Sequence, residues 1–262
     1  MDEVTISRAI IESYTKELLD AMELDVAIVG AGPAGMIAGY YLGKAGVKTA
    51  IFERKLSAGG GIWGGGMMFN KIVVQEEGKV ILDEVGIATE KYREDYYVAD
   101  AVETASTLCS CAVKAGAKIF NLMSVEDVVI REGDRVSGLV LNWSPVFMAK
   151  LHIDPLAIRV KLVIDATGHA CEICHIVTGK LGGKLRTETG GVIGEKSMWA
   201  EVGEREVARN AREVYPGLIV AGMAASAVFG LPRMGPVFGG MFLSGKEAAK
   251  LAVEMLRQGT SA

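Results

Sequence analysis

Histidine, carboxylate and arginine side chains stand at three places in the chain where turns are expected. His152 and Asp154 are two residues apart, so an extended segment would place both side chains on one face. His169 follows a strongly apolar stretch, and Arg233 lies in a turn rich in glycine and proline. Two imidazoles and a carboxylate with open positions suit Fe(II), and a guanidinium in a rigid turn can bind a carboxylate bidentately. The plainer alternatives are hydrogen-bonded imidazoles and a surface arginine.

The segment Gly30–Gly35 has the sequence GAGPAG, which fits the G-x-G-x-x-G pattern of dinucleotide-binding turns. Gly30 permits the tight turn, Gly32 lets the backbone approach a pyrophosphate, and Gly35 lets helix and strand pack closely. Glu53 stands about 20 residues further on, where an acid accepts hydrogen bonds from an adenosine ribose. Because a strand is expected before the turn and a helix after it, we predict that the turn binds the ADP half of a dinucleotide. The alternative is a tight turn that binds nothing.

Two of the four cysteines, Cys171 and Cys174, form a C-x-x-C-H pattern with His175. This is the pattern of c-type haem attachment, which would need an exported protein. A structural zinc bound by both thiols and a histidine is a second reading. We favour the third, which is that the two cysteines are buried on one face of a helix. Cys109 and Cys111 are also interpreted as packing residues.

The elements around these residues predict an α/β fold with a Rossmann-type sheet, like that of FAD- and NAD-binding two-dinucleotide flavoproteins, and a smaller inserted β element. Hydrophobic periodicity predicts a helix over Ile6–Met22, and a βαβ unit is expected from Asp25 to Glu53. We expect one domain over 1–262, with a helical arm at about 5–22 and an inserted sheet at about 118–160. Segment 178–205 is expected to be a loop that covers the site. Further helices are expected at 78–87, 98–115 and 235–256, and irregular or extended chain at 145–155. Strands are expected at 118–122, 124–131, 135–142, 159–166 and 218–221, with a hairpin turn at 132–134.

Composition describes an ordinary packed globule, with 50% hydrophobic and 23% charged residues. A net charge of −4 gives no basic face for a nucleic acid. The amphipathic, acidic N-terminus lacks the pattern of a secretory signal, and glycine or charge interrupts every apolar run before the ~20 residues that span a membrane. We therefore predict a cytoplasmic protein with free thiols and with no membrane or nucleic acid partner.

The choice between FAD and NAD depends on the C-terminal third. GAGPAG and the VIDATG sequence at 163–168 resemble elements of two-dinucleotide flavoproteins. Those proteins usually carry Gly-Asp after an apolar strand, and the aspartate holds the flavin's ribityl chain. The corresponding residues here are Gly222 and Met223, and methionine cannot accept those hydrogen bonds. This favours NAD, with an FAD-dependent oxidoreductase and a non-catalytic NAD-binding regulator as alternatives.

Five motifs follow one another along the chain: GAGPAG (30–35), GGGIWGGGMMFN (59–70), HIDP (152–155), ATGH (166–169) and RMGPVFGGM with a following SG (233–245). In their order and spacing the chain resembles the thiamine thiazole synthase family, in its archaeal form, over nearly its full length. The resemblance implies that NAD and glycine are converted into an adenylated thiazole carboxylate, ADP-5-ethyl-4-methylthiazole-2-carboxylate, with loss of nicotinamide. NAD would then be a substrate.

The resemblance also implies roles for the four candidate catalytic residues. Fungal and plant members have, at the position of His152, a cysteine that donates its own sulfur, whereas archaeal members with histidine use free sulfide and Fe(II) and turn over repeatedly. Asp154 and His169 would be the iron ligands, either from one chain or from two subunits. His152 would lie beside the reacting sugar carbons, and Arg233 would hold the glycine carboxylate.

The remaining assignments concern the dinucleotide and the partners. The resemblance implies a homo-oligomer, an octamer, with sites shared between subunits and the N-terminal helix as a contact. NAD, glycine and sulfide are the expected small-molecule partners. We assign ten residues to the dinucleotide site: Gly30, Gly32, Ala34, Gly35, Glu53, Arg54, Gly61, Val125, His152 and Met223.

Overall fold

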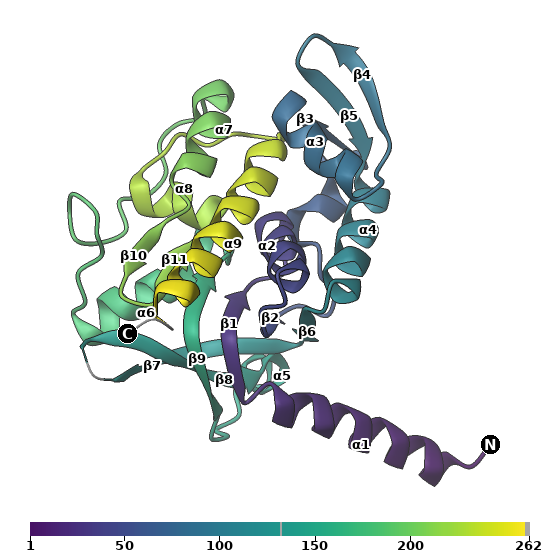
Figure 1. Cartoon of the computed structure of the whole chain (residues 1–262), viewed down its shortest axis with the longest axis vertical. Helices are drawn as coiled ribbons and strands as arrows, with labels where there is room; N and C mark the ends of the chain where they lie inside the picture. Colours follow the sequence, from purple (N-terminus) through teal and green to yellow (C-terminus); the bar gives the residue numbers. More distant parts are fainter. Residues whose placement is uncertain (132, 260–262) are drawn as a thin grey trace.

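The structure is a computed structural model that describes residues 1–131 and 133–259 (Figure 1). Its main sheet contains eight strands, six of them in the order β10-β11-β9-β1-β2-β6, with β8 and β7 continuing from β9. Neighbouring strands from β11 to β6 are parallel, whereas β10 and the β7–β8 hairpin pair antiparallel to their neighbours. The strands are β1 (Glu23–Val29), β2 (Thr49–Glu53), β6 (Lys118–Asn121), β7 (Met123–Arg131), β8 (Arg135–Trp143), β9 (Leu156–Asp165), β10 (Glu213–Tyr215) and β11 (Leu218–Val220).

Successive residues of the central strand β1 face opposite sides of the sheet and enter two separate hydrophobic cores. Val26 and Ile28 belong to the core formed with α2, α4 and α9, whereas Ala27 and Val29 belong to the core formed with α6, α8 and the β7–β8 hairpin. The sheet is therefore covered on both faces, as parallel sheets require. The helices are α1 (Glu3–Asp20), α2 (Pro33–Lys44), α3 (Glu76–Glu84), α4 (Ala101–Lys114), α5 (Ser144–Met148), α6 (Glu172–Leu181), α7 (Ala200–Arg209), α8 (Met223–Phe229) and α9 (Gly239–Gly259), with short 3₁₀ turns η1 (Gly60–Gly64) and η2 (Gly168–Ala170).

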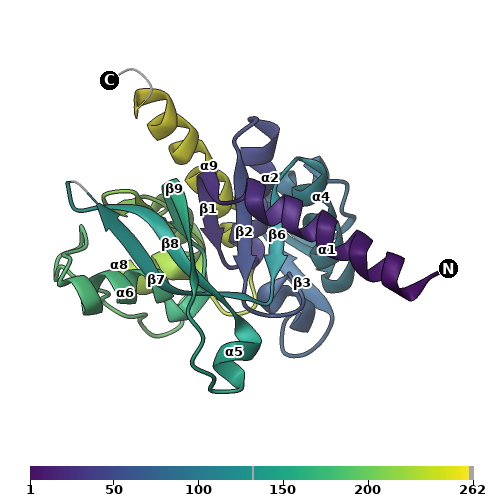
Figure 2. The ribbon, with the colours of Figure 1, turned by 90° about the horizontal axis from the view of Figure 1, so that it is seen from below.

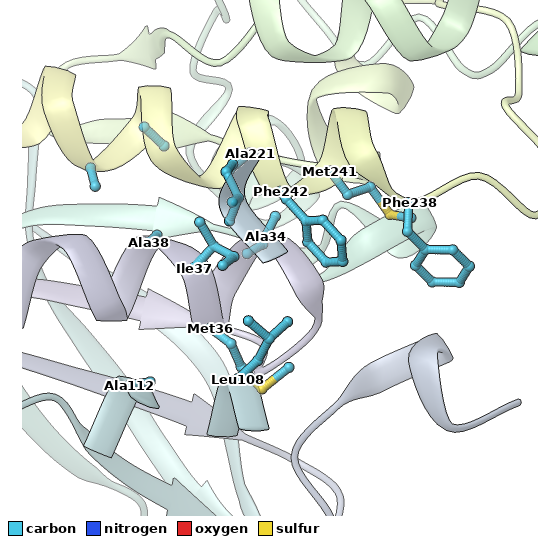
Figure 3. Packing of buried hydrophobic residues seen from close by; sticks show 14 of the residues in the cluster. Ala34, Met36, Ile37, Ala38, Leu108, Ala112, Ala221, Phe238, Met241 and Phe242 are labelled. Atoms are coloured by element: carbon cyan, nitrogen blue, oxygen red, sulfur yellow. The ribbon is translucent and has the colours of Figure 1, made fainter. Parts of the chain in front are cut away.

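Helices α2 and α9 pack closely across one face of the sheet. Figure 3 shows Ala34 and Ile37 of α2 close to Phe242 of α9, and Leu108 of α4 nearby. The approach depends on small residues, because a Cβ atom on Gly245 would lie 2.3 Å from the Ala34 carbonyl oxygen. Helix α9 is thus held directly over the N-terminus of α2, where the glycine turn lies.

The predicted βαβ unit is present as β1, α2 and β2, and the glycine turn joins its first two elements. Gly30 has a φ of +97°, which favours glycine, and a Cβ there would lie 2.5 Å from the Ala166 carbonyl oxygen. Pro33 occupies the first turn of α2, where its missing N–H leaves no hydrogen bond unmade. The Ala166 backbone and the first turn of α2 therefore leave the glycine turn little conformational freedom.

Gly35→Ala is expected to lower the free energy of unfolding by about 3 kcal/mol, because overpacking at a site with no room forces the backbone apart. The added Cβ would lie 2.0 Å from the Gly30 carbonyl oxygen. Urea unfolding of both chains measures the loss. Gly179→Ala in α6 is the matched control, since a Cβ there meets nothing within 4 Å and alanine favours the helix. An equal stability for the Gly35→Ala variant and the wild type would contradict the packing argument.

A second, smaller sheet differs from the sequence expectation. Strands β3 (Lys71–Val74), β5 (Tyr96–Asp100) and β4 (Thr89–Arg93) form an antiparallel sheet in the order β3-β5-β4. The helix expected from residue 98 begins only at Ala101, because Asp100 caps it by accepting hydrogen bonds from the Val102 and Glu103 amides. The predicted helix at 78–87 is present as α3.

Segment 118–160, expected as an inserted sheet, contains β6, β7, β8 and the start of β9. These strands are hydrogen-bonded members of the eight-stranded sheet, since β6 pairs with β2 and β8 pairs with β9. The strands predicted at 118–122, 124–131, 135–142, 159–166 and 218–221 are confirmed. Position 132 of the predicted 132–134 turn lies outside the described residues. Part of segment 145–155 is the short helix α5, and α7 occupies the end of segment 178–205.

Helix α1 extends from the body of the chain, as both views show (Figures 1 and 2). None of its 18 residues is buried, although Ile10, Ile11 and Leu19 are large and apolar. Its contacts with the body include an ion pair of 2.9 Å between Glu17 and Lys118. The predicted N-terminal helix is thus present, and Leu18 and Tyr14 contact the body while its other large apolar side chains are exposed. Within the described ranges, no helix combines the length and hydropathy needed to cross a membrane.

Candidate active site

A cavity of about 570 Å³ lies at the carboxyl ends of the parallel strands. Its lining includes Val29, Glu53, Ala166 and Ala221, which end or directly follow β1, β2, β9 and β11. Ligands of open α/β sheets bind at this edge, and the volume is that of a small-molecule site. The cavity is therefore the candidate active site.

Most of the predicted dinucleotide residues line this cavity, and two do not. Gly35 lies beneath the turn in α2, where its lack of a Cβ allows the turn to close, and His152 lies elsewhere. The cavity-lining members are Gly30, Gly32, Ala34, Glu53, Arg54, Gly61, Val125 and Met223.

Glu53 is buried at the end of β2 and already holds two backbone groups. Its Oε2 accepts a hydrogen bond of 2.8 Å from the Ala31 amide, and its Oε1 accepts one of 2.8 Å from the Lys55 amide. The carboxylate thus fastens the glycine turn to the end of β2. Since each carboxylate oxygen has a second lone pair, the same side chain can still accept from a ribose hydroxyl.

His169 and Arg233 meet at the cavity through a third residue, Glu195. The His169 Nδ1 lies 2.9 and 2.8 Å from the two Glu195 carboxylate oxygens, and the Arg233 Nε lies 3.8 Å from Oε2. A carboxylate on Nδ1 leaves Nε2 as the nitrogen available to a metal or substrate. The sequence did not identify Glu195, because a glutamate in a glycine-rich loop carries no local signal. Its segment, 178–205, was expected at the site, and Met198 from it lines the cavity.

His152 and Asp154 lie outside the cavity lining of their own chain. Both are exposed in the connection between α5 and β9, which protrudes from the body in Figure 2. The Asn142 side-chain amide donates to the Ile153 carbonyl at 3.1 Å and anchors this connection. Among the described residues, His152, Asp154 and His169 do not come within 4.8 Å of one another as a group. One chain alone therefore does not assemble the predicted metal ligands.

Asp165, Cys171 and Cys174 are buried with their ligand-type atoms within 4.8 Å of one another. The Asp165 carboxylate accepts four hydrogen bonds, from the Thr167 amide and hydroxyl at 3.0 and 2.7 Å and from the Ile173 and Cys174 amides at 3.1 and 3.2 Å. A hydrogen bond with Cys171 and burial raise the pKa of the Cys174 thiol well above its ordinary value. Neutral thiols and an engaged carboxylate are poor metal ligands. The cluster caps α6, in agreement with the packing interpretation of the cysteines.

Glu204 of α7 is a buried acid beneath the N-terminus of α9, and the sequence did not single it out. Its Oε1 accepts a hydrogen bond of 2.6 Å from the Gly240 amide. Its Oε2 is buried without a partner in the described residues, as is the Gln75 Oε1. Burial raises the pKa of Glu204 to about 7, although the Gly240 amide and the Gln75 side chain lower it.

Glu204→Gln is expected to remove a pH dependence of stability. A pKa raised from 4.5 to about 7 favours the protonated form in the folded state. The stabilisation by protonated Glu204 is therefore fully present below pH 4.5 and is lost as the pH rises through 7. Over this range the free energy of unfolding falls by up to about 3 kcal/mol. Thermal unfolding at intervals between pH 5 and pH 8 measures the difference between wild type and variant. We expect the stability of the wild type relative to Glu204→Gln to decrease as the pH rises. A stability difference that stays constant with pH would contradict the raised pKa of Glu204.

The chain matches known proteins over nearly its full length. A model of the Thi4 family matches residues 7–238. A thiamine thiazole synthase from Methanothermobacter thermautotrophicus is 62% identical over 98% of this chain and 99% of its own length. The corresponding protein of Pyrococcus horikoshii is 58% identical over 97% and 98%.

Solved structures agree with this match. The crystal structure of Thermovibrio ammonificans THI4 has a TM-score of 0.97 and 52% identity, covering 98% of this chain and 99% of that one. A geranylgeranyl bacteriochlorophyll reductase-like protein from Thermoplasma acidophilum has a TM-score of 0.56 at 15% identity over 90% and 79% of the two chains. The second likeness concerns the fold alone and agrees with the predicted flavoprotein-like sheet.

Proposed function

The chain belongs to the Thi4 family and is an enzyme, with thiamine thiazole synthesis as its function, and on that premise we propose that NAD, glycine and free sulfide are its substrates and Fe(II) its metal. The product would be ADP-5-ethyl-4-methylthiazole-2-carboxylate, with nicotinamide released. The observation that carries the proposal is that one cavity is lined both by the glycine turn and by His169 and Arg233. A dinucleotide on the turn would thus extend toward a histidine and a guanidinium.

The cysteines support free sulfide as the sulfur source. Cys171 and Cys174 are buried in the core, and Cys109 and Cys111 lie on α4. No cysteine of the described residues lines the cavity. A protein thiol would have to reach the reacting carbons from outside, whereas sulfide can diffuse in.

His169 and Asp154 are the side chains we propose to hold Fe(II). Nitrogen and oxygen donors of this kind suit the metal, and Glu195 leaves the His169 Nε2 free to ligate. When bound, Fe(II) would supply Lewis-acid stabilisation of negative charge that develops on the substrate. Arg233 would bind the glycine carboxylate, and His152 would lie beside the sugar carbons and exchange protons there.

A second copy of the chain must bring Asp154 to the cavity in this proposal. The residues that flank His152 and Asp154 are apolar and open, with Leu151 57% and Ile153 50% exposed. Most apolar side chains of helix α1 are also exposed in its own chain, among them Ile10, Ile11 and Leu19. Such surfaces are typical of subunit interfaces. We propose a homo-oligomer, an octamer, whose sites are shared between subunits.

The proposed location is the cytoplasm. All four cysteines are free thiols in the structure, as a reducing compartment would keep them. A net charge of −4 does not favour binding to a nucleic acid, and we propose no nucleic acid partner.

Mass spectrometry after anaerobic incubation with NAD, glycine, sulfide and Fe(II) tests the proposal. More than one adenylated thiazole carboxylate per chain would establish a sulfide-using catalyst. Product limited to one per chain would reject free sulfide and return attention to the cysteines. Intact NAD would contradict these substrates and favour an NAD-binding regulator, and a yellow protein with flavin absorbance would favour an oxidoreductase.

A further inference from the structure

Two acids and one guanidinium meet at the end of β2, where the adenosine ribose of a dinucleotide binds in this fold. Glu53 ends β2, Arg54 follows it, and Glu172 is the first residue of α6. All three line the cavity, and the Arg54 Nη1 forms an ion pair with the Glu172 Oε1. The Glu172 side chain is 30% exposed and that of Arg54 is 54% exposed, so water still reaches this ion pair.

The sequence of this corner leaves the nature of the ribose open. A carboxylate at the end of β2 binds a free 2′-hydroxyl, as in NAD, whereas an arginine nearby accommodates a 2′-phosphate, as in NADP. This chain carries both in succession, as Glu53 and Arg54. Local sequence therefore allows either nucleotide, and the partner of Arg54 decides between them.

Glu172 changes the charge that a 2′-phosphate would meet. Because Glu172 already neutralises the charge of Arg54, a 2′-phosphate bound here would lie close to the carboxylates of Glu53 and Glu172 without a free cation from Arg54. Burial raises the pKa of Glu172, Arg54 lowers it, and the charges of Asp165 and Glu53 raise it again. The two acids are thus near enough to influence each other. A phosphate bearing about two negative charges would be repelled and would have to displace an existing ion pair.

We propose that Glu172 selects NAD over NADP by occupying Arg54, so that the site accepts only an adenosine ribose with a free 2′-hydroxyl. The inference rests on the proposed function, in which the cavity binds the ADP half of a dinucleotide. Lys55 also lines the cavity and is exposed. Once Glu172 loses its charge, Arg54 and Lys55 together can bind a 2′-phosphate.

Calorimetric titration of the full-length protein with NAD and with NADP, without glycine, sulfide or iron, tests this. We expect the wild type to bind NAD at least about 100-fold more tightly than NADP, and Glu172→Gln to narrow that ratio at least about tenfold through tighter NADP binding. Arg54→Ala combined with Glu172→Gln should abolish the gain, because the gain acts through Arg54. Glu188→Gln, an exposed acid outside the cavity, controls for net charge.

Several outcomes would overturn the inference. Equal affinities of the wild type for NADP and NAD would overturn the inference before any variant is tested. Three results with the variants would also overturn it. The ratio of the NAD and NADP affinities could stay unchanged in Glu172→Gln, or it could narrow as much in Glu188→Gln. The tighter NADP binding could also persist when Arg54 is replaced as well. NAD binding that is absent from the wild type would reject the proposed substrate and this inference together. NAD binding with no selection would reject the inference alone.

Discussion

We expect Asp154→Ala and His169→Ala each to lower the rate of thiazole formation by about 10²–10³-fold when assayed alone, and mixing the two variants to restore part of the activity. Each change removes a proposed metal ligand, so the separate losses follow from an incomplete site. In one chain Asp154 lies outside the cavity that His169 lines. If a site takes His169 from one subunit and Asp154 from another, random mixing of equal amounts leaves about one quarter of the sites intact.

The measurement is product formation after the two variants are unfolded together, refolded and compared with each variant treated alone. Recovery near one quarter of the wild-type rate would support shared sites. No recovery would mean that one chain supplies both ligands, which would overturn the shared site. His175→Ala is the matched control, because this histidine is exposed on α6 outside the cavity and its loss should leave activity unchanged.

We expect Arg233→Ala to raise the KM for glycine by about 10²-fold and to leave the affinity for NAD within about twofold of the wild-type value. A guanidinium binds a carboxylate through two parallel hydrogen bonds, and losing one partner of such a pair costs about 2–4 kcal/mol. Arg233→Lys keeps the charge but not the fork, so it should recover only part of the affinity. Steady-state kinetics with glycine varied, together with a titration of NAD, separates the two effects.

Arg209→Ala is the control for this prediction, since Arg209 is an exposed residue of α7 that pairs with Glu206. A normal KM for glycine in Arg233→Ala would show that another group holds the substrate carboxylate. Equal losses for glycine and NAD would instead indicate a general disturbance of the cavity, since Arg233 lies close to Glu195.

The parts of the fold that the sequence predicted are those in which a local pattern carries the information. Gly30 needs glycine for its positive φ and Gly35 for its closeness to the Gly30 carbonyl, which are both local reasons. The run 159–166 is a strand that is buried on both faces from Leu162 onward. The β4–β5 hairpin was missed, since TEKYR is charged and exposed and lacks the alternation of a half-buried strand. Its pairing is determined by the neighbouring strand rather than by its own residues.

The candidate site divides in the same way. Gly30, Glu53 and His169 were identified because they directly follow predicted strands, and all three line the cavity. Glu195 and Glu204 were missed because their importance arises from contacts with residues far away in the chain. The separation of Asp154 from the cavity that His169 lines could not be predicted, because no periodicity describes where an exposed loop lies relative to the rest of the chain.

The two proposed metal ligands, His169 and Asp154, differ in how firmly the fold orders them, and Asp165 accounts for the order at His169. The four hydrogen bonds that Asp165 accepts fix the chain from the end of β9 to α6, so the loop bearing His169 loses its conformational entropy once, when the sheet folds. A metal that reaches His169 then meets a preorganised donor, and little ordering free energy is subtracted from its affinity. In the connection bearing Asp154, hydrogen bonds hold Lys150, Leu151 and Ile153, so the exposed Asp154 side chain would be ordered by the subunit that we propose to cover it. If the site is shared between subunits as proposed, the entropic cost of completing it is set by assembly rather than by folding.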